Sequence, residues 1–209
     1  MRDYVAWHNE YDEPDSRLAR RLVVVQSQFG AALDHHGDHA RILSLCAGQG
    51  RDVIGVLAER RLTATRALLI ELDERNAAVA ERAAREAGLK GVRVLCADAS
   101  DTDSARDGVP ADIVLACGIF GNISDDDIRN AIAHLPSLCA EGADVLWTRG
   151  WDDEAETSSV RAWFRDAGFA EVAFEARVLE PTPFSVGTHR LATRARPFAP
   201  GVRLFTFVR

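Results

Sequence analysis

The 209-residue chain is predicted to fold as a doubly wound α/β protein with a mostly parallel seven-stranded sheet. Two observations favour this class. From residue 40 onward, short apolar runs alternate with helical segments, which is typical of parallel strands covered by helices on both faces. The first of these runs is followed by the glycine-containing turn "CAGQG", at the place where folds of this class bind a ligand.

The first 39 residues are expected to form an N-terminal helical extension or lid, and residues 40–209 the main domain. Ser16 can cap a helix over residues 17–33, where apolar side chains recur at helical spacing, and Gly37 is a stop signal. The histidines that follow are interpreted as a solvent-facing linker rather than a metal site, because no set of carboxylates accompanies His35, His36 and His39.

The elements of the main domain follow from the alternation of apolar runs and helical segments. The last two strands have no helix between them, so they are expected to form an antiparallel pair at one edge, joined by a loop over residues 180–201. Gly88 and Gly168 mark helix ends, and "AEGA" is a turn before the fifth strand. The strands are expected at residues 41–47, 64–73, 91–98, 111–120, 143–150, 171–179 and 202–209, and the helices at 50–61, 74–88, 125–139 and 154–169.

Composition limits the classes of partner. The net charge of −7 disfavours a nucleic-acid substrate, and clusters such as Arg17, Arg20 and Arg21 are interpreted as solvated faces. There is no long apolar run and no signal-peptide pattern, so we expect a soluble, cytoplasmic protein without a membrane partner. The four cysteines are far apart and are expected to be small buried residues rather than metal ligands or disulfides. Nothing in the sequence indicates an oligomeric state.

The glycine turn is not a standard dinucleotide fingerprint. Gly48 and Gly50 lie in the first strand-to-helix turn, but Val53 stands where a third glycine or alanine would let the helix approach the strand. This pattern gives weak support for a nicotinamide or flavin dinucleotide.

Two acids follow the next two strands. Glu71 ends the second strand, 21 residues after Gly50, where a carboxylate could accept hydrogen bonds from both ribose hydroxyls. Asp73 is better interpreted as the N-cap of the following helix. Asp98 follows the third strand, where it can reach an exocyclic amine. After the fourth strand, Gly118 and Gly121 permit close backbone approach.

Taken together, "ILSLCAGQGRD", "LLIELD", "VLCADAS" and "ADIVLACGIFGNIS" resemble the class I S-adenosylmethionine-dependent methyltransferases over about residues 41–209. The resemblance implies a Rossmann-like fold with an antiparallel seventh strand and S-adenosyl-L-methionine as cofactor. It places Glu71 on the ribose and Asp98 on the adenine amine. The full set of implied cofactor-binding residues is Cys46, Gly48, Gly50, Asp52, Glu71, Leu72, Asp98, Ala99, Cys117 and Gly118.

The first loop departs from the pattern of that family at two positions. Cys46 replaces a glycine, and is expected to be tolerated with a negative φ. Ser44 replaces an acid that would order the loop or bind the methionine ammonium. Asp52 either compensates for that acid or complements the dipole of the following helix, and both interpretations stay open.

The acceptor side is assigned to the N-terminal segment, the loop after the fourth strand and the region near residue 189. We expect Tyr4, Tyr11 and Phe120 to contact the acceptor, His189 to act as general base, and Asn122 to orient the acceptor or cap a helix. The leading hypothesis is a methyltransferase acting on a small molecule. An RNA or protein methyltransferase, a non-catalytic nucleotide-binding module and a dinucleotide-dependent dehydrogenase remain alternatives.

Overall fold

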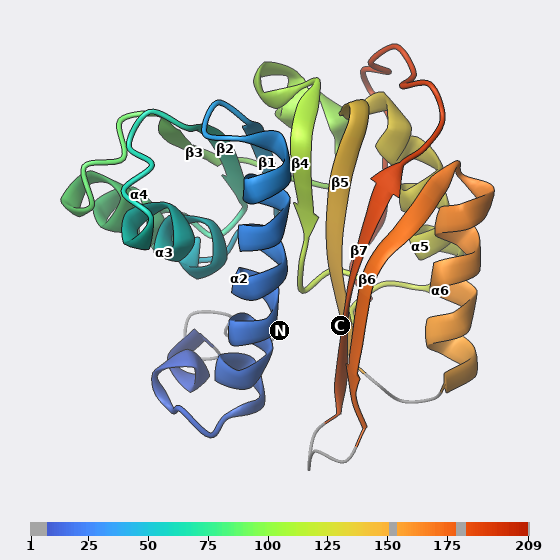
Figure 1. The fold of residues 1–209 in the computed structure, drawn as a ribbon, viewed down its shortest axis with the longest axis horizontal. Coiled ribbons are helices and arrows are strands. Elements are labelled where there is room, and N and C mark those ends of the chain that lie inside the picture. Colours follow the sequence, from blue (N-terminus) through green and yellow to red (C-terminus); the bar gives the residue numbers. More distant parts are fainter. Residues whose placement is uncertain (1–7, 151–153, 179–182, 209) are drawn as a thin grey trace.

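The computed structural model describes residues 8–150, 154–178 and 183–208. Its centre is a seven-stranded sheet with the order β3-β2-β1-β4-β5-β7-β6 (Figure 1). The pairs among β1 to β5 are parallel, whereas β7 is antiparallel to both β5 and β6. The predicted fold class is confirmed. The strands are β1 (Arg41–Leu45), β2 (Arg66–Glu71), β3 (Val92–Cys96), β4 (Ala111–Ala116), β5 (Cys139–Gly150), β6 (Phe169–Arg177) and β7 (Phe184–Leu191).

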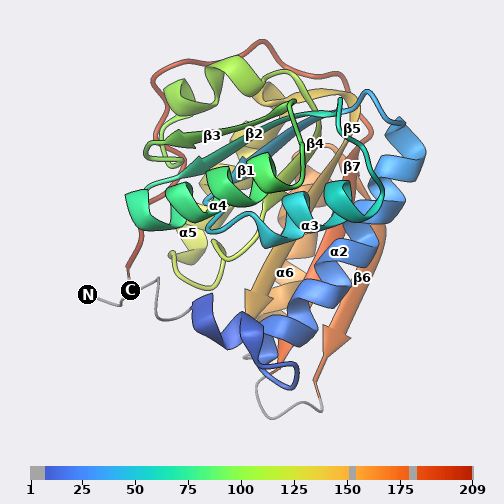
Figure 2. The ribbon, with the colours of Figure 1, turned by 90° about the vertical axis from the view of Figure 1, so that its left-hand side faces the viewer.

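Helices cover both faces of the sheet, with α2, α3 and α4 on one face and α5 and α6 on the other (Figures 1 and 2). Ser16 caps α2 by accepting a hydrogen bond from the Ala19 amide at 3.0 Å, and Gly37 ends it with φ +81°. No described helix is long and apolar enough to cross a membrane. The helices are α2 (Arg17–His36), α3 (Arg51–Glu59), α4 (Glu74–Glu86), α5 (Asp125–His134) and α6 (Glu154–Asp166), with 3-10 turns η1 (Asn9–Asp12), η2 (Thr102–Gly108) and η3 (Leu135–Ser137).

Alternate side chains of the central strands feed two apolar clusters, one on each face of the sheet. Ile42 of β1 belongs to one cluster together with Phe29 of α2 and Leu57 of α3, whereas Leu43 belongs to the opposite cluster, which includes Val160 of α6. All five are essentially inaccessible to solvent. Burial on both faces explains why these strands are short, almost wholly apolar runs.

The last strand is not where the sequence predicted it. Residues 184–191, expected to lie in a loop, form β7, and residues 202–208 make only isolated bridges at Arg203 and Phe207. The segment "FSVGTHRL" looks too polar for an inner strand, but its polar groups have partners: Thr188 Oγ1 donates to Gln28 Oε1 at 2.6 Å. Gly187 is also required, since a Cβ there would lie 2.5 Å from the Trp147 indole.

Two further expectations about the chain need correction. The predicted "AEGA" turn lies inside β5, where Gly142 has φ +73° and the register with β4 shifts. His36 is not a solvent-facing linker residue, because it ends α2 and its Nε2 lies 3.1 Å from the buried Asp144 carboxylate. The Arg190 guanidinium binds the same carboxylate through two hydrogen bonds of 2.8 Å.

The order of strands reverses between β1 and β4. The chain runs outward from β1 through β2 to β3, then returns to β4 on the other side of β1. The carboxyl ends of these four strands therefore meet at one edge, which in Figure 1 is the lower side, where the β4 arrow points and η1 lies. Open α/β sheets bind ligands at such a switch point.

Asp144 should be a major determinant of stability. We expect Asp144→Asn to lower the free energy of unfolding at pH 7 by about 3 kcal/mol, because it leaves Arg190 without its buried partner. Denaturant titration measures this, with Asp34→Asn as control, since Asp34 forms an exposed ion pair with Arg60.

The same variant has a defined pH dependence. Burial opposes ionisation of Asp144, but His36 and Arg190 outweigh it and hold the pKa below the ordinary 3.8. A carboxylate with a lowered folded pKa stabilises the protein above its unfolded pKa and loses that contribution as pH falls towards the folded value. The difference between wild type and Asp144→Asn should therefore shrink below about pH 4. A difference that stays constant down to pH 2 would contradict this.

Candidate functional site

The glycine turn leaves β1 through three residues in the left-handed region. Cys46, Gly48 and Gly50 have φ of +53°, +56° and +69°. A Cβ on Gly50 would lie 2.7 Å from Ile54 Cδ1 and 2.8 Å from Leu69 Cδ2, so only glycine allows α3 to start this close to β2. The loop is thus a tightly determined backbone structure at the switch point.

Glu71, at the end of β2, is bonded to this loop. Its Oε2 accepts the Gly48 amide at 2.7 Å, and its Oε1 accepts the Asp73 amide at 2.9 Å. The side chain of Asp73 accepts the Arg75 amide, which confirms Asp73 as the N-cap of α4. Each Glu71 oxygen accepts one of these backbone hydrogen bonds and has a second lone pair.

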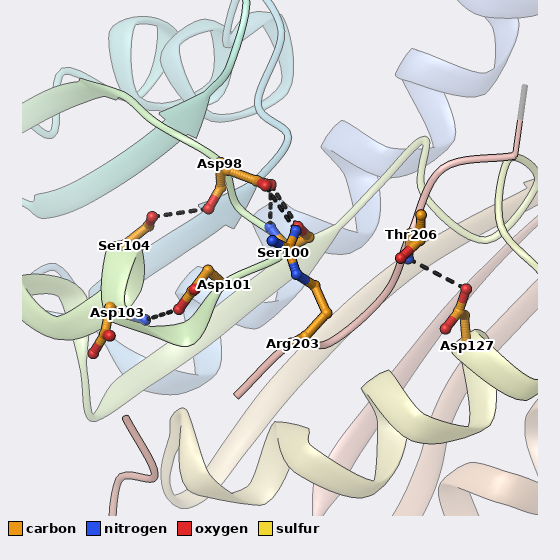
Figure 3. A network of polar contacts seen from close by, with 8 residues as sticks. All are labelled: Asp98, Ser100, Asp101, Asp103, Ser104, Asp127, Arg203 and Thr206. Carbon is orange, nitrogen blue, oxygen red and sulfur yellow. Dashed lines mark hydrogen bonds and ion pairs between the residues drawn. The ribbon is translucent and has the colours of Figure 1, made fainter. Parts of the chain in front are cut away.

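The end of β3 supplies Asp98, whose carboxylate is held from two directions. Its Oδ1 accepts the Ser100 amide at 2.9 Å, and its Oδ2 accepts Arg203 Nη1 at 2.8 Å (Figure 3). Burial opposes ionisation, but the Ser100 and Arg203 contacts outweigh it and lower the pKa of Asp98. Nearby, Ala99 is buried, whereas the apolar side chain of Leu72 is 65% exposed.

The loop after β4 is fixed by hydrogen bonds to its backbone. The Gly118 amide donates to Thr148 Oγ1 at 2.8 Å, and Asn122 Nδ2 donates to the Gly118 carbonyl at 2.8 Å. Gly118 has φ +78°, and a Cβ built on it would meet no atom within 4 Å, so this backbone faces open space. Asn122 does not cap α5, because Ser124 is the N-cap. Asn122 braces the loop instead.

Three polar side chains, Tyr11, Arg21 and Asp52, lie together at the start of α3, beside the loops after β1 and β4. Arg21 is only 8% exposed, and its Nη2 lies 3.4 Å from the Tyr11 hydroxyl. Burial raises the pKa of Asp52, partly offset by the Val53 amide and the Arg21 charge. Burial likewise raises the pKa of Tyr11 and of Cys117, which feels the Asp52 charge. The arginine-rich sequence around residue 20 suggested a solvated face, but Arg21 is buried.

Two residues predicted to meet the acceptor lie in the core. His189 is 1% exposed, stacks on Phe164 at 4.4 Å, and accepts a hydrogen bond from Trp147 Nε1 through Nδ1 at 3.1 Å. Burial lowers the pKa of His189 to about 4, despite the Glu171 charge. Phe120 is 2% exposed and packs near Trp147 and Phe164. Neither side chain has the exposure that the predicted roles of base and acceptor contact require, because His189 of β7 and Phe120 of the loop after β4 both pack against Phe164 of α6.

The four cysteines differ in how far they are exposed to solvent. Cys46 has a positive φ, contrary to expectation, so it adopts the conformation of the glycine that it replaces. Burial, with the charges of Glu71 and Asp98, raises the pKa of its thiol. Burial also raises the pKa of Cys139, whereas Cys96 is exposed, which corrects its expected burial. Among the described residues, no three His, Cys, Asp or Glu side chains could together hold a metal ion.

The N-terminal segment reaches the same edge of the sheet. A Cβ on Gly48 would lie 2.3 Å from His8 Nε2, so this buried imidazole lies directly against the glycine loop. Tyr4, predicted to contact the acceptor, falls outside the described residues.

Arg21 and Arg203 were not predicted from the sequence as site residues. Only the unusual density of arginine near residue 20 hinted at the first, and no local pattern indicated the second.

A family model described as a methyltransferase domain matches residues 42–142. These residues contain the glycine turn, Glu71, Asp98 and the loop after β4. This match identifies a methyltransferase domain over residues 42–142. It bears out the resemblance of the four sequence motifs to the class I S-adenosylmethionine-dependent methyltransferases. Comparison with curated proteins found no match.

Solved structures agree with this methyltransferase fold. Magnesium protoporphyrin IX methyltransferase from Synechocystis PCC 6803 with bound S-adenosylhomocysteine is 15% identical, with a TM-score of 0.67 over 90% of this chain and 93% of that one. The 1,6-didemethyltoxoflavin-N1-methyltransferase of Burkholderia thailandensis is 18% identical, with a TM-score of 0.59 over 91% and 90%. The methyltransferase SibL is 20% identical, with a TM-score of 0.56; 75% of this chain matches 51% of SibL.

The strain at Cys46 can be measured by substitution. A non-glycine residue in the left-handed region costs about 1–2 kcal/mol, and glycine loses somewhat more entropy on folding. We therefore expect Cys46→Gly to leave the free energy of unfolding unchanged or raise it by up to about 1 kcal/mol. The β-branched Cys46→Val should lower it by about 1–2 kcal/mol. Equal destabilisation by both, measured in urea, would contradict the role of backbone strain.

Proposed function

We propose that this protein transfers a methyl group from S-adenosyl-L-methionine to a small-molecule acceptor. The observation that carries the proposal is the ordered set of groups at the carboxyl ends of β1, β2, β3 and β4: the Gly48 loop, Glu71, Asp98 and Gly118. The net charge of −7 and the small-molecule methyltransferases among similar structures support a small acceptor.

The chain's own groups fit this cofactor. Glu71 can accept both ribose hydroxyls with its remaining lone pairs, and exposed Leu72 offers apolar surface to one face of the adenine. Asp98 accepts a hydrogen bond from the exocyclic amine of the adenine, and the Ala99 amide lies beside it. When bound, S-adenosyl-L-methionine supplies an electrophilic methyl group on a cationic sulfonium. The protein binds and orients this group along Cys46, Gly48, Gly50, Cys117 and Gly118.

Arg21 and Asp52 suit the amino-acid end of the cofactor. A buried guanidinium can bind a carboxylate with good geometry, and Asp52 offers an acceptor to an ammonium. Tyr11, against Arg21, belongs to the same group and can also border the acceptor. Asp52 thus takes the role of the acid that Ser44 replaces.

The described part of the N-terminal extension, residues 8–39, serves as the lid of this site. Support comes from His8 and Tyr11, whose rings lie 5.6 Å apart at the glycine loop, and from α2, which packs on the same face of the sheet as α3. A base is optional in methyl transfer from a sulfonium, because positioning accounts for much of the rate enhancement. His8 is the histidine placed to accept a proton from the acceptor.

Calorimetry with S-adenosylhomocysteine and NAD tests the choice of cofactor. We expect S-adenosylhomocysteine to bind and NAD to give no heat. Incubation with methyl-labelled S-adenosyl-L-methionine and a cell extract then tests the acceptor, with label expected in the low-mass fraction. Binding of NAD alone would overturn the proposal, and label confined to RNA or protein would overturn its small-molecule part.

Glu71→Ala should weaken S-adenosylhomocysteine binding on the order of 100-fold, since two hydrogen bonds to a charged acceptor are lost. Glu74→Ala, three residues further on in the first turn of α4, is the matched control and should bind normally. Thermal unfolding checks that both variants are folded. Unchanged affinity in folded Glu71→Ala would show that the ribose lies elsewhere.

Arg21→Met should weaken S-adenosylhomocysteine binding at least about tenfold, because one charge-assisted contact to the carboxylate is lost. Methylthioadenosine, which lacks the amino-acid portion, provides the internal control and should lose little affinity. If both ligands lost affinity equally, Arg21 would act through the fold and not through the carboxylate.

A further inference from the structure

The C-terminal segment, residues 192–208, returns from β7 to the ends of β3 and β4. Figure 2 shows it passing along the side of the molecule where η2 and β3 lie. Its backbone is tied to the loop after β3, because the Leu204 amide donates to the Ser100 carbonyl at 2.7 Å and the Thr102 amide to the Val202 carbonyl at 3.0 Å. The segment is therefore an integral part of this edge.

Contacts on the other side fix the segment against α5 and the loop after β4. Asn130 Nδ2 donates to the Leu204 carbonyl at 2.8 Å, and the Val208 amide donates to the Asn122 carbonyl at 3.0 Å. Leu204 and Phe205 are each 1% exposed. The Thr206 amide also donates to Asp127 Oδ2 at 3.2 Å (Figure 3). These anchors give Arg203 a defined backbone position between the two loops.

Arg203 points from this segment to Asp98. Its Nη1 donates to Asp98 Oδ2 at 2.8 Å and also contacts Ser100 Oγ. Ser100 in turn donates to Asp98 Oδ1 through both its amide, at 2.9 Å, and its hydroxyl, at 2.5 Å. The carboxylate is thus held at Oδ1 by the loop after β3 and at Oδ2 by the C-terminal segment.

We propose that Arg203 is a positioning residue of the cofactor site, which holds Asp98 as the acceptor that selects a 6-amino purine. This inference rests on the proposed function, in which Asp98 receives the adenine amine. It adds the C-terminal segment to the site and assigns base selectivity to a contact made from 105 residues away in the sequence.

The count of lone pairs indicates that Arg203 assists the amine rather than displacing it. A carboxylate has about four acceptor positions, and the contacts from Ser100 and Arg203 use three of them. The vacant position is on Oδ2, beside the Arg203 contact. Ionisation keeps that oxygen an acceptor only, and the lowered pKa of Asp98 is consistent with this state.

Selectivity follows from the chemistry of the base. An ionised carboxylate accepts a hydrogen bond from a 6-amino group, but it repels the 6-oxo group of an inosine base. Loss of the Arg203 contact leaves Asp98 held at Oδ1 by Ser100 alone, so the direction of Oδ2 is less firmly fixed. Binding of the amino ligand should then weaken, whereas binding of the oxo ligand, which Asp98 disfavours, should not weaken.

The test compares calorimetric affinities for S-adenosylhomocysteine and its deaminated analogue, S-inosylhomocysteine. We expect wild type to prefer the adenosyl ligand, and Arg203→Met to reduce this preference on the order of tenfold through loss of adenosyl affinity. Arg203→Lys, which keeps a donor, should restore part of the preference. Arg106→Met is the matched control, because Arg106 has the same side-chain exposure of 58% and pairs with Asp103 instead.

The variant Asp98→Asn distinguishes the role of Asp98 in binding the adenine amine from the role of Arg203 in positioning Asp98. If Asp98→Asn and Arg203→Met both reduce the preference, the inference stands. If only Asp98→Asn does so, Asp98 reads the base without Arg203 and the inference is overturned. If neither does so, the assignment of Asp98 to the adenine fails, and this inference with it. Equal loss of both ligands in Arg203→Met, with a lowered melting temperature, would show a structural role and would also overturn it.

Discussion

The hydrogen bond from the Gly48 amide to the Glu71 carboxylate joins the ends of the first two strands. It forms only because β1 and β2 are parallel neighbours in register, from Arg41 opposite Arg66 to Leu45 opposite Ile70. Gly48 must also adopt a left-handed conformation to present its amide. The turn, Glu71 and the N-cap Asp73 therefore depend on one another, and a shift of register would separate them.

The same parallel arrangement concentrates polar groups at the carboxyl ends of the strands. The side chains on the two faces of the sheet are mainly apolar. Asp98 follows β3 and Gly118 follows β4, the strands on either side of the β2-β1 pair, so residues distant in sequence share one surface. The N-terminal segment reaches this surface through His8 and Arg21, and the C-terminal segment through Arg203. Both ends of the chain thus contribute to a site whose central part lies in the matched methyltransferase domain.

Much of this could be predicted from the sequence, because the information was local. Apolar runs located the inner strands, Ser16 and Gly37 bounded α2, and the residues at strand ends indicated a candidate site. Prediction failed where tertiary contacts decide. The segment of β7 is polar, and only its pairing with β5 and β6 and the space above Trp147 make it a strand. His189 seemed to be a free base because the sequence does not show the aromatic rings that bury it. Arg203 makes its defining contact across 105 residues, which no spacing rule covers.

A crystal structure with S-adenosylhomocysteine would show whether these groups bind the cofactor. We expect the ribose hydroxyls on Glu71, the adenine amine on Asp98 with Arg203 still paired to that carboxylate, and the amino-acid end towards Arg21. Adenine bound away from Asp98, or an Arg203 side chain displaced by the base, would contradict it.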